Sequence, residues 1–203
     1  DVVPLGVIIR QPTGLFVKYD AKWKTFDELL ADAKVNEIKG GITGFGSADE
    51  LHLMQMTHKG YKFRPVPFAK AGVRYTSILG GHADVLVEQA GDIRSFLESK
   101  QMRPLVFFSD KPAVGFPDVP LAKDHGFALS ISQFRAILMR AGTDPKHVAT
   151  MAAAVEKAAG TADFKQYLKE QYAFADSFIP AAQTAAFFER ELKLIEAALP
   201  KKS

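Results

Sequence analysis

The sequence predicts an α/β protein whose main lobe is built on a parallel or mixed β-sheet. Short apolar runs of strand length alternate with helical segments between residue 14 and about residue 110, as in strand–helix–strand units. A glycine-rich loop, GITGFGS at residues 41–47, joins one predicted strand to the helix that follows it. From residue 143 onwards only helices are expected. These observations indicate a sheet whose ligand loops lie where its strands end.

The first predicted elements are two short strands and a helix. Residues 7–9 and 15–17 are apolar runs, and the sequence QPTG at residues 11–14 between them predicts a turn. Thr25, with Glu28 three residues later, forms a capping box that predicts a helix start. The apolar residues of this helix then share one face, namely Phe26, Leu29, Leu30 and Ala33.

Strands and helices alternate through the middle of the chain. Strands are expected at residues 38–43, 84–88 and 105–108, and helices are expected to end near Gly60, to end at Gly80 and Gly81, and to span residues 93–97. Residues 63–68 are expected to be extended. Their two prolines, Pro65 and Pro67, cannot donate to a sheet ladder and therefore exclude a central strand position.

The character of the chain changes after residue 120. Residues 127–139 form a mixed apolar stretch, and Thr143 and Thr161 are expected at helix N-caps, with Gly160 as a stop between them. The last helix is predicted to carry an apolar stripe, formed by Phe188, Leu192, Ile195 and Leu199. These helices have no strands of their own to cover, so we expect them to pack on another part of the molecule.

Composition excludes several classes of function. The 26 basic and 23 acidic residues give a net charge of +3 and form no Lys/Arg block, so nucleic acid is an unsuitable partner. No apolar run approaches the roughly 20 residues of a membrane span. The absence of cysteine excludes disulfides and thiolate chemistry and fits an exported protein. The chain begins at Asp1 without Met or a signal segment, so we expect that an upstream part has been removed.

The glycine loop is the first candidate site. A glycine-rich turn that opens a helix gathers backbone N–H groups at the positive end of the helix dipole, which suits a small anion or a carboxylate. Two alternatives remain: a nucleotide cradle, although the order G-x-x-G-x-G differs from G-x-G-x-x-G, and a tight turn that holds no ligand. Asp49 and Glu50 complicate the anion interpretation, because they either cap the helix and point outward or point inward and repel a carboxylate.

The sequence gives little support for a metal site or for an acyl-transfer enzyme. His52 and His58 are six residues apart, whereas a helical metal pair needs a spacing of four, so the histidines are expected to be surface or partly buried residues and no metal is predicted. Ser47 lacks the G-x-S-x-G frame of a nucleophile elbow, so an acyl-transfer enzyme is a weak hypothesis. No cofactor is expected.

Two further stretches complete the candidate site. Lys70, Arg74 and Arg64 form a basic cluster around the second strand-to-helix loop, which can hold a carboxylate or be an exposed charged face. Glu88 ends the third strand, where it could receive an amino or hydroxyl group or cap the next helix. The predicted ligand-binding residues are Thr43, Gly44, Phe45, Gly46, Ser47, Ala48, Asp49, Lys70, Ala71, Gly72, Arg74, Glu88 and Gln89.

An ordered set of five segments resembles the solute receptors of the tripartite tricarboxylate transporter family, also called Bug receptors. GITGFGS is similar to the family's G-S-S-G-x-G-S, and LGGHADV at residues 79–85 is similar to its L-L-G-G-x-V-D. PDVP at residues 117–120, followed by Gly126 and Phe127, resembles L-P-D-V-P and a later G-F. The segments at residues 25–34 and 141–145 also match. The resemblance covers essentially the whole chain.

The resemblance implies a periplasmic binding protein fold of type II, with two α/β lobes that close on a small carboxylate. Residues 14–130 would form the second lobe, and residues 1–13 and 131–203 the crossover strands and a remnant of the first lobe. The family's opening section, with its P-A-G-G-G loop, would precede Asp1. The chain is then expected to be either part of a longer receptor or a homo-oligomer that borrows the missing sheet from another copy.

The departures from the family pattern concern charge. Ala48, Asp49 and Glu50 stand where family members usually have Ser-Asn-His, and residues 68–74 replace Tyr-Lys-Gly-Gly-Ala-Pro. The acidic pair and the cations Lys70 and Arg74 act in opposite directions on a bound carboxylate.

The expected function is that of a non-enzymatic, periplasmic receptor that captures a small organic acid, a di- or tricarboxylate or a related acid, and presents it to membrane transporter subunits. Backbone amides of residues 44–49 would hold one carboxylate, and closure of the lobes about the crossover strands would trap it. A sensor that hands its closed form to a signalling receptor is one alternative. An α/β enzyme that uses the glycine loop is another.

Overall fold

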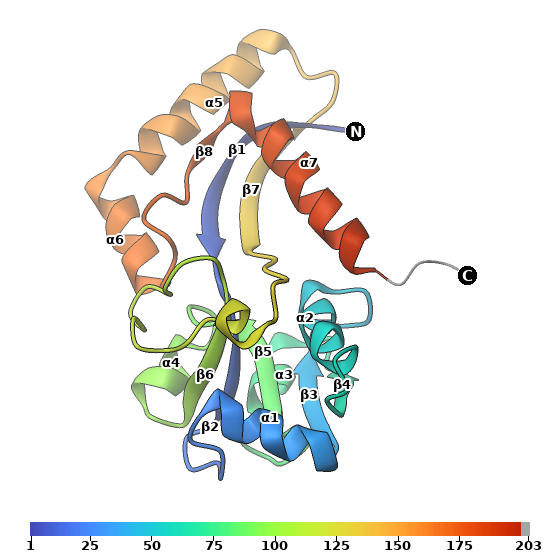
Figure 1. Ribbon diagram of the computed structural model, residues 1–203. Coiled ribbons are helices and arrows are strands. Elements are labelled where there is room, and N and C mark those ends of the chain that lie inside the picture. Colours follow the sequence, from blue (N-terminus) through green and yellow to red (C-terminus); the bar gives the residue numbers. More distant parts are fainter. Residues whose placement is uncertain (200–203) are drawn as a thin grey trace.

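Two β-sheets lie one above the other, and the chain crosses between them twice, from β1 into β2 and from the end of the larger sheet into β7 (Figure 1). The computed structural model describes residues 1–199. The strands are β1 (Val2–Gln11), β2 (Thr13–Lys18), β3 (Ile38–Ile42), β4 (Phe63–Pro67), β5 (Val85–Gln89), β6 (Met102–Phe108), β7 (Gln133–Arg140) and β8 (Ile179–Pro180). The helices are α1 (Phe26–Val35), α2 (Ala48–Thr57), α3 (Ala71–Ser77), α4 (Arg94–Glu98), α5 (Pro145–Ala159), α6 (Ala162–Glu170) and α7 (Ala181–Ala198), with a 3₁₀ turn, η1, at Ala122–His125.

The larger sheet has the strand order β4-β3-β5-β2-β6 and is mixed. Strand β3 runs parallel to β4 and β5, whereas β2 runs antiparallel to β5 and β6. The expectation of an α/β lobe on a parallel or mixed sheet is therefore confirmed in its mixed form. The proline-rich strand β4 lies at the edge of the sheet, where its missing N–H groups cost no ladder bond.

Alternation along the central strands builds the core on both faces of the larger sheet. Leu15 and Val17 of β2 pack with α1 and α2 on one face. Phe16 of the same strand packs on the opposite face, with Ile93 and other residues around α3 and α4. All four apolar residues predicted for one face of α1 are buried, and Thr25 caps that helix by accepting from the N–H of Glu28.

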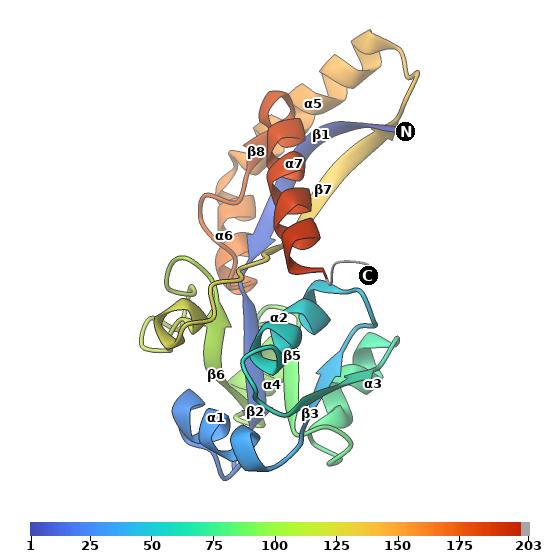
Figure 2. The same ribbon diagram turned by 45° about the vertical axis from the view of Figure 1, so that its right-hand side comes forward.

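The smaller sheet has the order β7-β1-β8, and its strands pair antiparallel. Strand β7 overlaps the mixed apolar stretch at residues 127–139, for which periodicity alone predicted no element. Helices α5 and α7 both contact β1, so the C-terminal helices pack on this sheet. In both views α7 runs from the smaller sheet down toward α2 of the larger one (Figure 1, Figure 2). Among residues 1–199, no helix combines the length and the hydropathy needed to cross a lipid bilayer.

Three local predictions are wrong. No turn separates the first two strands, because β1 ends at Gln11 and β2 begins at Thr13, with Pro12 alone between them. Asp144 caps α5 by accepting from the N–H of Lys146, whereas the Thr143 hydroxyl donates to the Arg140 carbonyl. The chain beyond residue 143 also contains the short strand β8.

The predicted apolar stripe of α7 is displaced around the helix. Leu192 is 54% exposed and Leu199 is 42% exposed, while the buried residues of the helix are Thr184, Phe187 and Glu191. Phe187 meets Phe134 of β7 edge to face, with ring centroids 5.0 Å apart, and Phe188 of the predicted stripe stacks on the same ring at 5.5 Å. The prediction is therefore right for Phe188 and wrong for Leu192 and Leu199, because packing on β7, and not periodicity alone, decides which residues are buried.

Paired truncations on α7 should distinguish the observed stripe from the predicted one. Phe187→Ala removes a side chain that is 5% exposed and should lower the free energy of unfolding by about 3–5 kcal/mol. Leu192→Ala should change it by about 0.5 kcal/mol or less, because that side chain lies in solvent. Urea denaturation of both variants measures the difference. Equal losses would contradict the observed packing of α7.

Candidate functional site

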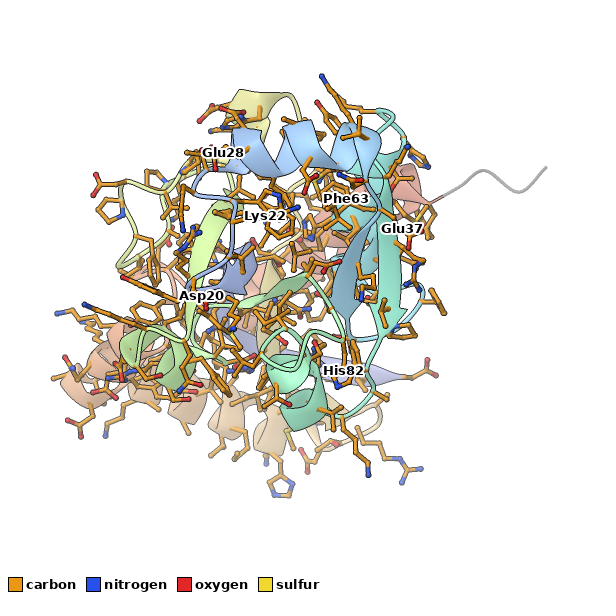
Figure 3. The ribbon with its side chains drawn as sticks, turned by 90° about the horizontal axis from the view of Figure 1, so that it is seen from below. Asp20, Lys22, Glu28, Glu37, Phe63 and His82 are labelled. Carbon is orange, nitrogen blue, oxygen red and sulfur yellow. The ribbon has the colours of Figure 1, made fainter. Side chains whose placement is uncertain are left out.

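The three predicted stretches lie at one edge of the larger sheet. The glycine loop follows β3, Lys70 lies in the loop that follows β4, and Glu88 and Gln89 end β5. Arg64 does not belong to the predicted basic cluster, because it lies near the start of β4 and pairs with the exposed Glu37 at 2.6 Å. These strands are parallel, so their carboxyl ends meet at the same edge, which faces the smaller sheet (Figure 1). Figure 3 views the molecule from the opposite end, where Glu37, Phe63 and His82 lie near the starting ends of β3, β4 and β5.

Side chains of α2 tie down the two ends of the glycine loop. Asp49 is 1% exposed, and its Oδ2 accepts from the N–H of Thr43 at 3.1 Å and from the Thr43 hydroxyl at 2.6 Å. Glu50 accepts from the Gly46 N–H at 2.5 Å. The Ser47 hydroxyl caps α2 by accepting from the Glu50 N–H at 3.3 Å. Asp49 therefore points inward beneath the loop, and Glu50 occupies one of the amides predicted to bind a ligand.

Three other amides of the loop remain available. Among the described residues, no acceptor takes the N–H groups of Gly44, Phe45 or Ala48, whereas Asp49 is 1% exposed and its N–H is out of a ligand's reach. The loop is open, since Phe45 is 71% exposed and a Cβ placed on Gly44 or Gly46 would meet nothing within 4 Å. Free N–H groups at the start of a ten-residue helix form a suitable seat for a carboxylate.

Arg74 forms a buried ion pair with Glu88 of β5, and Lys70 is an exposed cation. Arg74 is buried and donates through Nε (3.0 Å) and Nη2 (2.7 Å) to Oε2 of Glu88, while its Nη1 donates to the Phe68 carbonyl. Burial raises the pKa of Glu88 to about 7, although the Arg74 guanidinium acts to lower it. Lys70 is exposed at the N-cap position of α3 without capping it.

The remaining predicted residues differ in exposure. Ala71 and Gly72 are exposed beside Lys70, whereas Gln89 is buried and its Nε2 has no partner among the described residues. Glu88 neither caps a helix nor faces solvent, because its two oxygens bind Arg74 and the Gln89 N–H. Whether any of the predicted residues contacts a ligand stays a prediction.

His52 departs from the expectation that the histidines lie at or near the surface. It is fully buried, stacks on Phe108 with ring centroids 4.4 Å apart, and accepts at Nε2 from the Ile131 N–H at 3.2 Å. Burial lowers its pKa to about 3, so the ring is neutral. Within residues 1–199, no group of three or more His, Asp or Glu side chains is arranged to hold a metal ion.

Two cavities that the sequence did not indicate lie against α7. One, of about 440 Å³, is lined by Arg10, Ser109, Lys111, Ser130, Arg190 and Glu191, among others. The other, of about 400 Å³, lies between α2 and the end of α7. One signal in the sequence could have indicated the first cavity. Ser109 directly follows β6, and polar residues that follow a strand gather at the same sheet edge.

Comparisons with known proteins agree on a family. The family model described as "Tripartite tricarboxylate transporter family receptor" matches residues 1–200. A curated relative from Cupriavidus necator, "UPF0065 protein in gbd 5'region", is 27% identical over 191 residues, which are 93% of this chain and 58% of the relative. The chain thus spans less than two thirds of that relative.

Solved structures share the fold. A TctC solute binding protein from Polaromonas is 26% identical, with a TM-score of 0.76 over 98% of this chain and 69% of that one. The protein Rpa4515 of R. palustris, solved with adipate, is 20% identical, with a TM-score of 0.87 over 98% of this chain and 67% of that one. The periplasmic binding protein fold that the sequence predicted is confirmed.

The buried Glu88 should make stability depend on pH. Its pKa is about 7 in the folded protein and 4.5 in an ordinary setting, so the unfolded chain loses this proton first as the pH rises. As the pH rises from 4.5 to about 7, the free energy of unfolding should therefore fall by up to about 3 kcal/mol, at about 1.4 kcal/mol per pKa unit.

Urea denaturation at about pH 5 and about pH 8 measures this change. Glu88→Gln should flatten the dependence, whereas Glu37→Gln, at an exposed ion pair, should leave it as in the parent protein. A parent-like slope in Glu88→Gln would show that another group titrates.

Proposed function

Because the chain belongs to the tripartite tricarboxylate transporter receptor family, we propose that it is an extracytoplasmic solute receptor. It captures a small di- or tricarboxylate, or a related organic acid, at the glycine loop and presents it to the membrane subunits of a tripartite tricarboxylate-type transporter. The proposed location is the periplasm. The match of the family model to residues 1–200 carries this proposal.

The open amides of the glycine loop supply a physical basis for carboxylate capture. The N–H groups of Gly44, Phe45 and Ala48 are available in the loop and at the start of α2, where the helix dipole favours negative charge. A carboxylate seated there forms hydrogen bonds that its own charge strengthens. Adipate, found with the R. palustris structure, is a dicarboxylate, and this agrees with the proposed ligand class.

Charge around the loop favours a ligand with separated carboxylates. Glu50 and the buried Asp49 place negative charge on the α2 side of the loop, while Lys70 is an exposed cation after the neighbouring strand β4. Arg74 is held below the surface by Glu88 and does not face the loop. One carboxylate at the loop amides and a second near Lys70 would match this distribution.

No residue of the proposed receptor is given a catalytic role. The Ser47 hydroxyl is engaged as the N-cap of α2, and its hydrogen bond is to a backbone N–H rather than to a basic side chain. The proposed receptor therefore returns its ligand unchanged.

Calorimetric titration of the complete gene product with adipate, succinate and citrate tests the proposal. One equivalent of at least one acid should bind and should be recovered unaltered by mass spectrometry of the eluted ligand. Calorimetry suits this test better than fluorescence, because Trp23 is buried beside α1, away from the glycine loop. Conversion of a bound acid, or failure of every carboxylate to bind, would contradict the proposed function.

Gly44→Val should weaken carboxylate binding at least about tenfold, because a side chain there enters the space where the ligand approaches the backbone. Stability should change by about 0.5 kcal/mol or less, since a Cβ on Gly44 meets nothing within 4 Å. Gly46 is a poorer probe, because its φ of +77° would strain any other residue. Gly160→Ala, at the end of α5, is the control. Unchanged affinity in Gly44→Val would place the binding site elsewhere.

A further inference from the structure

The cavity of about 440 Å³ beside α7 is bounded by elements of both sheets. Arg10 belongs to β1 of the smaller sheet, and Arg190 and Glu191 belong to α7, which packs on that sheet. Ser109 and Lys111 follow β6 of the larger sheet, and they close the cavity from the other side. None of these residues belongs to the glycine loop. A molecule in this cavity would therefore touch both halves of the protein.

Glu191 supplies a buried carboxylate oxygen that lacks a partner. The residue is 6% exposed and lines the cavity. Its Oε1 accepts from Nη2 of Arg190 at 3.0 Å, but no described residue donates to its Oε2, which is buried. A buried carboxylate oxygen without a donor is costly, so the arrangement favours a guest that brings an N–H or O–H group to it.

The cations around the cavity differ in how many of their N–H groups already have a partner. Lys111 and Arg10 both pair with Asp176, at 2.8 Å and 3.4 Å. Arg190 uses Nε and Nη2 to hold Glu191, which leaves its Nη1 uncommitted among the described residues. Adjacent residues of the same helix therefore offer an acceptor, Oε2 of Glu191, and a donor, Nη1 of Arg190. The Asp110 carboxylate and the Ser132 hydroxyl also line the cavity and form no hydrogen bond within the described residues.

We propose that this cavity is a second ligand site, distinct from the glycine loop, and that it takes a small zwitterion. The ammonium group donates to Oε2 of Glu191, and the carboxylate accepts from Nη1 of Arg190. The aliphatic part rests against Leu194, which also lines the cavity.

The charge of the lining excludes the simpler ions. Three cations, Arg10, Lys111 and Arg190, face two acids, Asp110 and Glu191, so the lining carries one net positive charge. This balance disfavours a pure amine. A dicarboxylate is disfavoured as well, because the second carboxylate would meet the unpartnered oxygen of Glu191. A zwitterion satisfies both groups with no net charge added.

Three matched probes test the proposal: L-alanine, propionate, which lacks the ammonium group, and ethylamine, which lacks the carboxylate. Calorimetric titration of the complete gene product should give an affinity for L-alanine at least tenfold above that for either of the others. Glu191→Gln should lower the affinity for L-alanine at least tenfold. Glu189→Gln, an exposed change on the same helix, should not alter it.

Retained L-alanine binding in Glu191→Gln, equal affinity for propionate, or no binding of L-alanine would each overturn the proposal. Gly44→Val separates this site from the glycine loop, because that variant should keep its affinity for L-alanine while it loses affinity for a dicarboxylate. The second site does not rest on the proposed function, and loss of one binding event without the other identifies which of the two proposals fails.

Discussion

The path of the chain from β1 into β2 determines where the ligand loops can lie. One residue, Pro12, separates a strand of the smaller sheet from a strand in the interior of the larger one. Because β2 enters from above and runs antiparallel to β5 and β6, those neighbours must run back toward the smaller sheet. Strand β3, parallel to β5, does the same. The loops that follow these strands therefore face the junction between the two sheets.

The segment at residues 129–131, which leads from the larger sheet back into β7, is hydrogen-bonded to α2, the helix that follows the glycine loop. Gln55 of α2 exchanges two hydrogen bonds with the backbone of Leu129, at 3.0 Å and 3.3 Å, and His52 accepts from the N–H of Ile131. The neutral state of His52 is required for this bond, since only an unprotonated ring nitrogen can accept. The helix that follows the glycine loop is therefore bonded directly to the segment that leads into β7.

Charged side chains near the sheet edge are bound inside the protein. Arg74 and Glu88 pair below the surface, and Oδ2 of Asp49 accepts from the N–H and the hydroxyl of Thr43, while its Oδ1 has no partner among the described residues. Removing one member of such a buried pair leaves an uncompensated charge, so the pair organises the edge more than it attracts a ligand. The surface that remains is made of backbone amides and Lys70. If the proposed site is correct, its specificity would depend on the shape and spacing of the ligand's carboxylates.

The sequence by itself determined the alternation of strands and helices, the buried face of α1 and the glycine loop at the start of α2, because capping residues and periodicity act over a few neighbouring residues. It also located the sheet edge, since parallel strands bring their carboxyl ends together. The tertiary structure alone decided three things. It placed β2 antiparallel within its sheet, turned α7 so that Phe187 as well as Phe188 packs on Phe134 of β7, and paired Arg74 with Glu88, which lies fourteen positions away. Each depends on partners distant in the chain, and local spacing carries no information about which partner a side chain will meet.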